Sequence, residues 1–438
     1  MTQTPVPVAA QRIAIIGAGP IGLEAALYAA TLGHDVVVYE QGDLAAAVQA
    51  WRHIQLFSPW AMNVTPLGLA TLAAMGQPLR GNLDDRDRPP GAGDFVDQYL
   101  RPLSQSPRLQ GRIRTGRRVL AVGRPTLLKG DLIGQAARGA RGFRLLLAES
   151  PPSAPPGDCA TATESIATAD VVIDCSGTFF HPAALGDGGI PALGERALTD
   201  RITHRVPDLA GRDRARFAGR RVLVVGAGHS AATAITLLSD LALEHPTQAA
   251  QVTWVTRGDR PLPYAPQESD PLPTRRRLHQ AANGAIGQPH CTLLAGHVVH
   301  RVAPAADGGV TVDLRPTASA PTDSTAFRHI VVDEILALTG YGPDRSIYEQ
   351  LQIHECYASL GPMKLAATLL GATGDCLAQP LPGRDTLKNP EPGFFILGAK
   401  SYGRGSAFLL QIGHAQVRSL FQLLHGQSDL DLYATTSS

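Results

Sequence analysis

The stretch that decides the fold is RIAIIGAGPIGLEAALYAATLGHDVVVYEQ, residues 12–41. It begins with an apolar strand (13–16), continues through glycines in G-x-G-x-x-G spacing, and predicts a helix followed by a second apolar strand. Gly17 permits a tight turn, Gly19 lets a pyrophosphate approach the backbone, and Gly22 lets the helix pack close to the strand. Strand, glycines, helix and strand in one unit predict a dinucleotide-binding fold.

The end of this unit predicts how the sugar of the dinucleotide is held. Glu40 directly follows the second strand, where a carboxylate accepts hydrogen bonds from a ribose 2′-hydroxyl. The predicted helix N-terminus places its backbone N–H groups near the phosphate charge. We therefore expect this first site to bind its cofactor through Gly17, Gly19, Pro20, Gly22, Glu40 and Gln41.

A second strand–turn–helix–strand unit of the same kind is RRVLVVGAGHSAATAITLLSDLALEHPTQAAQVTWVTRG, residues 220–258. Ala231 replaces the third glycine, so we expect helix and strand to lie slightly further apart than in the first unit. The second strand ends at Thr256 and Arg257 instead of an acid, and a guanidinium suits the 2′-phosphate of NADPH. We expect NADPH to contact Gly226, Gly228, His229, Ser230, Ala231 and Arg257.

Short strands follow each opening and predict an α/β fold of two Rossmann-like dinucleotide-binding domains, each with a parallel sheet and an added β-meander. This plan is typical of flavoproteins in which an NADPH-binding domain is inserted into an FAD-binding domain. The predicted bounds are 1–204 and 331–438 for the two parts of the FAD domain and 205–330 for the insertion. The predicted strands are 119–122, 143–147 and 171–174 in the first half and 298–302, 310–314 and 330–336 in the second.

The composition excludes several classes of protein. Lys and Arg number 39 against 38 Asp and Glu, giving a net charge of +1 and no electrostatic basis for binding nucleic acid or a membrane surface. The apolar runs are shorter than the roughly 20 residues that span a membrane. The N-terminus lacks a charged region before its first strand, so no signal peptide is predicted and a cytoplasmic location is expected.

No C-x-x-C pair or metal-ligand spacing connects Cys159, Cys175, Cys291, Cys356 and Cys376, and no metal is expected.

These motifs resemble the flavin-dependent oxidoreductases with two dinucleotide folds, and among them the flavin-containing and N-hydroxylating monooxygenases. The resemblance spans nearly the whole chain and rests on GAGPIG with Glu40, on FAGRRVLVVGAGHSA (217–231), on the ALTG turn (337–340) and on the closing segment (393–413). It implies an enzyme that uses FAD and NADPH, forms a C4a-hydroperoxyflavin with O2, and oxygenates a nitrogen or sulfur atom of a small molecule. A homodimer is a possible assembly.

The resemblance also implies residues at the flavin ring. Related monooxygenases place a segment with a Trp and an Asn over the flavin, and AWRHIQLFSPWAMNVTPLG (50–68) has this character. Trp51, Ser58 and Asn63 are therefore the expected catalytic residues, and Trp51 is also expected to contact the cofactor.

The closing segment, GFFILGAKSYGRGSAFLLQIG (393–413), has Gly398 followed by Ala399 where many flavoproteins have Gly-Asp. N-hydroxylating relatives likewise close with a strand, a Gly, a polar loop and a helix that starts with small residues. The resemblance implies that Gly405, Ser406 and Ala407 start this helix and direct its N–H groups at the flavin, so Gly398, Gly405 and Ser406 join the expected FAD contacts. Lys400, Tyr402 and Arg404 stand on the preceding loop and are expected to contact substrate.

Two other functions remain open on the sequence alone. One is an NADPH-dependent flavin reductase that passes electrons to a quinone, protein or disulfide acceptor without C-x-x-C chemistry. The other is a nucleotide-sensing role without catalysis.

Overall fold

The computed structural model describes residues 9–79, 87–149, 163–265, 270–319, 326–370 and 383–434. The chain forms two compact units: unit 1 contains residues 1–181 and 342–438, and unit 2 contains residues 182–341. Unit 2 is longer than the predicted insertion because strands on both sides of 205–330, namely β8 (Ile202–Thr203) and β15 (Glu334–Ala337), pair within its sheet.

Unit 1 is built on a five-stranded sheet in the order β16-β7-β1-β2-β3, with every pair parallel. Its central strands are almost wholly buried, as expected for a parallel sheet covered on both faces. The strands are β1 (Arg12–Ile16), β2 (Asp35–Tyr39), β3 (Ile113–Arg114), β7 (Val171–Asp174) and β16 (Phe394–Ile396).

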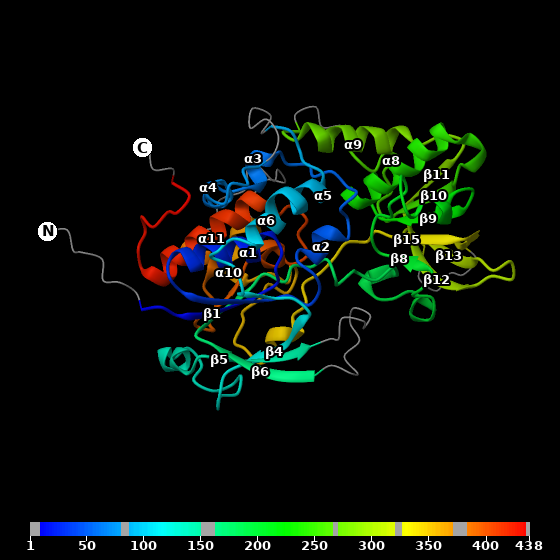
Figure 1. The fold of residues 1–438 in the computed structure, drawn as a ribbon. Helices are drawn as coiled ribbons and strands as arrows, with labels where there is room; N and C mark the ends of the chain where they lie inside the picture. Colours follow the sequence, from blue (N-terminus) through cyan, green and yellow to red (C-terminus); the bar gives the residue numbers. More distant parts are fainter. Residues whose placement is uncertain are drawn as a thin grey trace. The chain divides into compact units, whose positions relative to one another are not determined.

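An antiparallel meander of β4 (Arg117–Gly123), β5 (Phe143–Glu149) and β6 (Thr163–Ala169) completes the strands of unit 1. The helices α1 (Pro20–Thr31) and α11 (Leu410–His425) pack side by side although they come from opposite ends of the chain (Figure 1). The remaining helical segments are α2 (Ala46–Gln49), α3 (Trp60–Asn63), α4 (Pro66–Ala74), α5 (Ala92–Phe95), η2 (Val96–Leu100), α6 (Arg101–Ser104), η3 (Ala136–Arg141), η8 (Ser346–Tyr348), α10 (Met363–Leu370), η9 (Arg384–Leu387) and η10 (Gly398–Tyr402).

Unit 2 repeats the plan with a parallel sheet in the order β11-β10-β9-β15-β8 and an antiparallel meander β12-β13-β14. The predicted single segment 330–336 is wrong, because it divides at Asp333 into the end of β14 in the meander and the start of β15 in the parallel sheet. The other strands are β9 (Arg221–Val225), β10 (Gln251–Thr256), β11 (Cys291–Ala295), β12 (His297–Pro304), β13 (Val310–Pro316) and β14 (Arg328–Val332), and the helices are η4 (Asp187–Gly189), η5 (Glu195–Ala197), α7 (Arg214–Phe217), α8 (His229–Glu244), η6 (Pro246–Gln248) and α9 (Pro273–Gly284).

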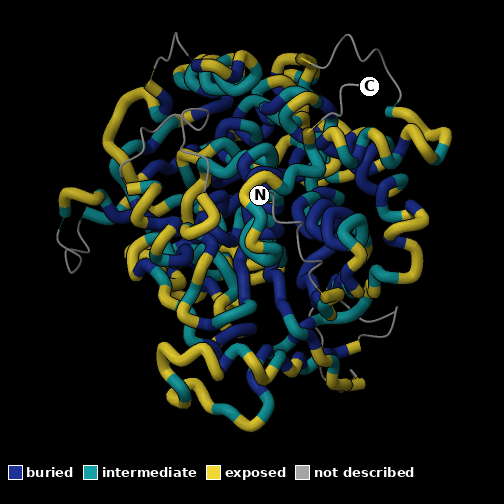
Figure 2. The backbone as a smooth tube through the Cα atoms, turned by 90° about the vertical axis from the view of Figure 1, so that its left-hand side faces the viewer, coloured by how far each residue is buried: buried dark blue, intermediate teal, exposed yellow. Residues whose placement is uncertain are grey.

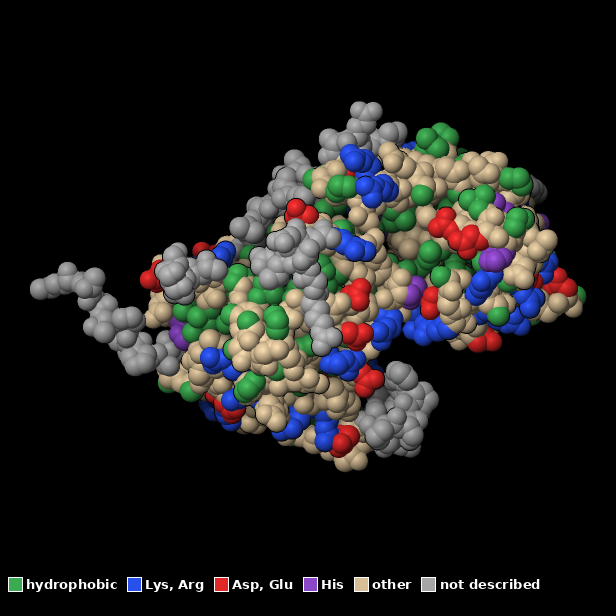
Figure 3. Space-filling view, turned by 45° about the horizontal axis from the view of Figure 1, so that its top comes forward, with side chains coloured by type: hydrophobic (Ala, Val, Ile, Leu, Met, Phe, Trp, Pro, Cys, Tyr) green, Lys and Arg blue, Asp and Glu red, His purple; other side chains and the backbone are tan. Residues whose placement is uncertain are grey.

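The α/β fold with two Rossmann-like units, each carrying a parallel sheet and a meander, is thus confirmed. Burial concentrates on the strands and the helices packed against them, whereas connecting loops carry most exposed residues (Figure 2). On the face drawn in Figure 3, acidic and basic side chains are interspersed, which agrees with the near-zero net charge. Within the described ranges, no helix is both long and apolar enough to cross a membrane.

Candidate cofactor sites

The turn between β1 and α1 in unit 1 has the shape that a pyrophosphate requires. Gly17 has a φ of +99°, which favours glycine, and a Cβ atom at Gly22 would lie 1.9 Å from the Gly17 carbonyl oxygen. A Cβ atom at Gly19 would meet nothing within 4 Å, so open space borders the backbone there. Pro20 is the first residue of α1. The turn therefore offers an open cradle at a helix N-terminus, which fits the phosphates of a dinucleotide.

Glu40 holds this turn from the end of β2. Its Oε2 accepts a hydrogen bond from the Ala18 N–H at 2.8 Å, and its Oε1 accepts one from the Gly42 N–H at 2.9 Å. Burial raises the pKa of the Glu40 carboxyl above its ordinary value, while these backbone donors act in the opposite direction. Glu40 therefore lies beside the glycine turn, as the ribose-binding prediction requires. Gln41 follows it and is exposed.

A buried ion pair that the sequence did not reveal lies at the carboxyl ends of β7 and β16. Lys400 Nζ is 2.5 Å from Asp174 Oδ2 and donates to Ser176 Oγ at 3.0 Å, and both charged side chains are fully buried. The Ser176 hydroxyl in turn donates to Asp174 Oδ1 at 2.7 Å. Lys400 thus joins the two chain segments of unit 1 at the carboxyl edge of the sheet, the edge at which open α/β folds generally bind ligands.

Two of the three side chains that were predicted to contact a substrate are therefore buried. Lys400 is paired with Asp174, and Tyr402 is buried, packing its ring edge-on against Phe408. Only Arg404 of the three is exposed. The substrate-binding role of these residues stays a prediction. Arg404 is exposed to solvent, as contact with a substrate requires.

The predicted start of the last helix is wrong. Gly405, Ser406 and Ala407 are not helical, and α11 begins at Leu410 after an extended N-cap residue, Leu409. The intervening segment turns instead, because the Gly405 N–H donates to the Tyr402 carbonyl and Phe408 packs on the Tyr402 ring.

Helix α11 reaches the Gly398 turn through the side chain of Gln416. Gly398 has a φ of +71°, and its N–H donates to Gln416 Oε1 at 2.8 Å. Gln416 Nε2 donates to Ser401 Oγ, whose hydroxyl donates to the Gly398 carbonyl at 2.7 Å. This closed ring of hydrogen bonds fixes η10, so the turn that replaces the usual Gly-Asp pair is rigidly held.

Two of the residues expected at the flavin ring, Ser58 and Asn63, hydrogen-bond to each other and to the local backbone. Ser58 Oγ donates to Asn63 Oδ1 at 2.7 Å, and Asn63 Nδ2 donates to the carbonyls of Ser58 and Pro59 at 2.9 Å. Both amide protons of Asn63 therefore hold the turn before α3 (Trp60–Asn63). Trp51 is half-buried against the main core of unit 1. The roles of Trp51, Ser58 and Asn63 toward a flavin stay predictions.

The corresponding turn in unit 2 lies between β9 and α8. Gly226 has a φ of +131°, and a Cβ atom there would lie 2.2 Å from the Leu338 carbonyl oxygen, whereas Gly228 borders open space. His229 and Ser230 are the first two residues of α8, and Ala231 is fully buried. The space beside Gly228, at a helix N-terminus, fits a second dinucleotide pyrophosphate.

The end of β10 carries the charge expected of an NADPH site. Arg257 follows the last residue of β10 and is exposed, as is Arg260. Arg275 differs, because it is ion-paired at 2.7 Å with Asp270, whose side chain is buried. The exposure of Arg257 is compatible with binding a 2′-phosphate, and that role stays a prediction.

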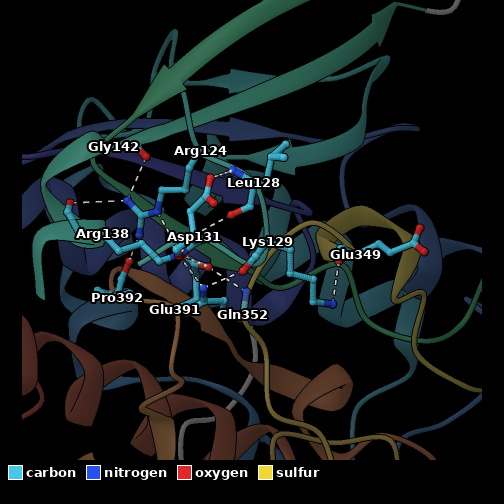
Figure 4. A network of polar contacts seen from close by, with 11 residues as sticks. Arg124, Leu128, Lys129, Asp131, Arg138, Gly142, Glu349, Gln352, Glu391 and Pro392 are labelled. Carbon is cyan, nitrogen blue, oxygen red and sulfur yellow. Dashed lines mark hydrogen bonds and ion pairs between the residues drawn. The ribbon is translucent and has the colours of Figure 1, made fainter. Parts of the chain in front are cut away.

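A buried ion network lies within unit 1 (Figure 4). Arg124 Nε lies 2.7 Å from Glu391 Oε1, and Arg138 Nε lies 2.9 Å from Glu391 Oε2. Glu391 Oε2 also accepts from the Gln352 N–H at 2.8 Å. One carboxylate, fully buried, therefore holds two guanidinium groups and connects β4 and η3 to the C-terminal part of the unit.

The three cysteines of the described residues differ in their surroundings. Cys175, Cys291 and Cys356 are free thiols. Burial raises the pKa of the Cys175 thiol well above its ordinary value and that of Cys291 to about 11, whereas hydrogen bonds from Ser359 lower the pKa of the Cys356 thiol. Over the part of the chain that the structure describes, no cluster of His, Cys, Asp or Glu could hold a metal ion.

The fold consists of two Rossmann-like units, each with a glycine turn at the start of a helix. Residues 12–133 match the DAO family of FAD-dependent oxidoreductases, so the chain carries an FAD-dependent oxidoreductase domain. FAD is accordingly the cofactor of unit 1, where the cradle at Gly19 and the carboxylate of Glu40 fit it. A search of curated proteins found no match.

Solved structures share the whole architecture at low sequence identity. The bacillithiol disulfide reductase Bdr from Bacillus cereus is 18% identical with a TM-score of 0.63, covering 95% of this chain and 99% of that one. DfoA bound to FAD, a desferrioxamine biosynthetic cadaverine monooxygenase from Erwinia amylovora, is 15% identical with a TM-score of 0.62, covering 96% and 95%. A mutant flavin monooxygenase from Stenotrophomonas maltophilia is 16% identical with a TM-score of 0.54, covering 96% and 99%. At such identities the likeness concerns the fold.

Proposed function

We propose that this FAD-dependent oxidoreductase takes its electrons from NADPH and oxygenates a nitrogen or sulfur atom of a small molecule. The observation that carries the proposal is the contrast between the two sites. The first turn is closed by a buried carboxylate, Glu40, and the second is followed by an exposed guanidinium, Arg257. An acid at the ribose suits FAD, whereas a base suits the 2′-phosphate that distinguishes NADPH from NADH.

Each set of residues has a defined task in this proposal. The helix N-termini of α1 and α8 bind the two pyrophosphates, and Arg257 selects the phosphorylated nicotinamide cofactor. Bound FAD would accept a hydride from the nicotinamide and pass electrons to an acceptor. The rigid η10 turn, fixed by Gln416 and by the Lys400–Asp174 pair, holds the backbone at the carboxyl end of β16.

The choice between oxygen and another acceptor distinguishes the two candidate functions. Burial raises the pKa of the Cys175 thiol and so disfavours its reactive thiolate form, whereas hydrogen bonds from Ser359 lower the pKa of the Cys356 thiol. Oxygen transfer to an amine or thioether needs no protein base. The fold shared with DfoA and with the Stenotrophomonas enzyme supports monooxygenation by analogy. The alternative is an NADPH-dependent reductase that passes electrons to a quinone, protein or disulfide acceptor, and Bdr supports it in the same way.

Rapid mixing separates these two functions. Protein reduced without oxygen is mixed with oxygenated buffer while the flavin spectrum is recorded. A monooxygenase is expected to show an oxygen-dependent transient that differs from the reduced and oxidised spectra and decays faster with an accepted amine or thioether. Reoxidation in a single step, accelerated by a quinone, would assign the reductase function instead.

Replacing Arg257 by alanine is expected to weaken NADPH binding selectively. Loss of one charge-assisted hydrogen bond to a phosphate corresponds to about 1.5–3 kcal/mol, or a roughly 10- to 150-fold higher Kd for NADPH. NADH lacks the 2′-phosphate, so its Kd should stay nearly unchanged. Calorimetric titration of the FAD-loaded protein with both nucleotides measures this.

Arg328→Ala is the matched control, because Arg328 is an exposed arginine of the same unit that lies on the meander strand β14. It should leave both dissociation constants unchanged. An equal rise of the Kd for NADPH and for NADH in the Arg257 variant would show that Arg257 does not recognise the 2′-phosphate.

A further inference from the structure

Two aromatic side chains hold the carbonyl oxygens of the glycine turn in unit 2. Trp254, on β10, donates from Nε1 to the Gly226 carbonyl at 2.8 Å. Tyr264 donates from its hydroxyl to the Gly228 carbonyl at 2.9 Å, and this oxygen also accepts the first α8 bond from the Ala232 N–H at 3.1 Å. Both rings are buried. We refer to Trp254 and Tyr264 as the aromatic clamp.

The clamp determines where the N–H groups of the turn point. In a trans peptide the N–H is opposite the C=O of the same plane, so fixing one carbonyl fixes the next N–H. Trp254 thereby orients the Ala227 N–H, and Tyr264 orients the His229 N–H. Within the described ranges the Ala227 N–H has no hydrogen-bond partner, whereas its counterpart in unit 1, the Ala18 N–H, donates to Glu40.

Tyr264 is itself held in place from two sides. Its ring stacks on His279 of α9 at 4.3 Å between centroids, and His279 stacks on His229 at 5.3 Å. Its backbone is bonded to Asn283 of α9, which donates from Nδ2 to the Tyr264 carbonyl at 2.7 Å. Burial lowers the pKa of His229 to about 4 and also lowers that of His279, so neither ring carries a charge that would separate the stack near neutral pH.

The two turns differ at the third position of the glycine motif and in the partner of the first glycine's carbonyl. In unit 1 the Gly17 carbonyl oxygen leaves no room for a Cβ atom at Gly22. In unit 2 the corresponding carbonyl, that of Gly226, is bonded to Trp254, and Ala231 is accommodated without exposure. The two turns therefore share a glycine pattern but hold their peptide planes by different means.

We infer that Trp254 and Tyr264 are positioning residues that orient the Gly226–Gly228 turn for the pyrophosphate of the nicotinamide dinucleotide, an inference that rests on the proposed use of NADPH. They act through the backbone and need no direct contact with the nucleotide. Their part in binding is thus separate from that of Arg257, which would contact the 2′-phosphate.

The test compares two ligands that share the 2′-phosphate but differ in the pyrophosphate. Tyr264→Phe removes only the clamp hydroxyl, and binding of NADP+ and of adenosine 2′-monophosphate to the FAD-loaded protein is measured by calorimetry. Loss of one hydrogen bond should raise the Kd for NADP+ about 3- to 10-fold, while the Kd for adenosine 2′-monophosphate, which lacks the pyrophosphate, stays unchanged. The kcat for flavin reduction at saturating NADPH should also be unchanged.

Tyr341→Phe is the matched control, because Tyr341 also donates its hydroxyl to a backbone carbonyl of unit 2, that of His204. It should bind NADP+ like the unaltered protein. An unchanged Kd for NADP+ in Tyr264→Phe would overturn the clamp. So would an equal loss of affinity for NADP+ and adenosine 2′-monophosphate in this variant, or an equal loss of NADP+ affinity in Tyr264→Phe and Tyr341→Phe. If the unaltered protein does not bind NADP+, the proposed function itself fails. If it binds NADP+ and Tyr264→Phe binds it equally well, only the clamp fails, so the two failures are distinguishable.

Discussion

Purified protein in which Gly22 is replaced by alanine is expected to contain less FAD than the unaltered protein. The added Cβ atom would lie 1.9 Å from the Gly17 carbonyl oxygen, so α1 must move away from β1 or the turn must change shape. Overpacking of this kind costs about 1–3 kcal/mol, and here the strain falls on the pyrophosphate cradle itself. We expect FAD affinity to fall by roughly 5- to 150-fold. Flavin absorbance per protein and titration of the apoprotein with FAD measure this.

The matched control is Gly123→Ala at the end of β4, in the same unit. A Cβ atom there would meet nothing within 4 Å, and the residue does not require a positive φ. This variant should retain its full complement of FAD. Normal FAD content in Gly22→Ala would contradict the assignment of the first glycine turn as the FAD cradle.

Replacing Glu391 by glutamine is expected to cause the largest loss of stability in unit 1. The neutral side chain would leave Arg124 and Arg138 as two buried guanidinium groups without a counter-charge (Figure 4). Removing one partner of a buried ion pair typically costs about 3–5 kcal/mol. Chemical denaturation of the FAD-loaded protein should therefore show a lower unfolding midpoint, with FAD released in the same transition.

Glu149→Gln makes the same chemical change at a half-exposed ion pair with Arg117. Exposed pairs contribute about 0–1 kcal/mol, so this control should unfold almost like the unaltered protein. Equal midpoints for the two variants would mean that the Glu391 network is dispensable for stability.

The features predictable from the sequence are those encoded locally. Apolar strands, glycine spacing and the residue that follows the second strand lie within about 40 residues of one another, and they correctly predict both turns and the α/β fold. The ion pair of Asp174 with Lys400 was missed because its partners are 226 residues apart and neither lies in a recognised motif. Its only signal was an acid at the end of an otherwise apolar strand, VVID (171–174).

The aromatic clamp and the start of α11 were missed for related reasons. Trp254 looks like an ordinary buried strand residue, and nothing in the sequence shows that its indole N–H reaches Gly226 across the sheet. Gly405 and Ser406 were expected to start a helix by resemblance, but packing of Phe408 against Tyr402 keeps that segment turned until Leu410. Tertiary contacts, rather than local propensity, decide both features.

The central claim is that FAD in unit 1 is reduced by NADPH bound in unit 2. The most direct test is an oxygen-free titration of the FAD-loaded protein with NADPH and, separately, with NADH, following the loss of flavin absorbance. The proposal predicts stoichiometric reduction by NADPH and reduction by NADH that is at least about 10-fold slower at equal, subsaturating concentration, because NADH lacks the phosphate that Arg257 recognises. No reduction by NADPH, or faster reduction by NADH, would contradict it.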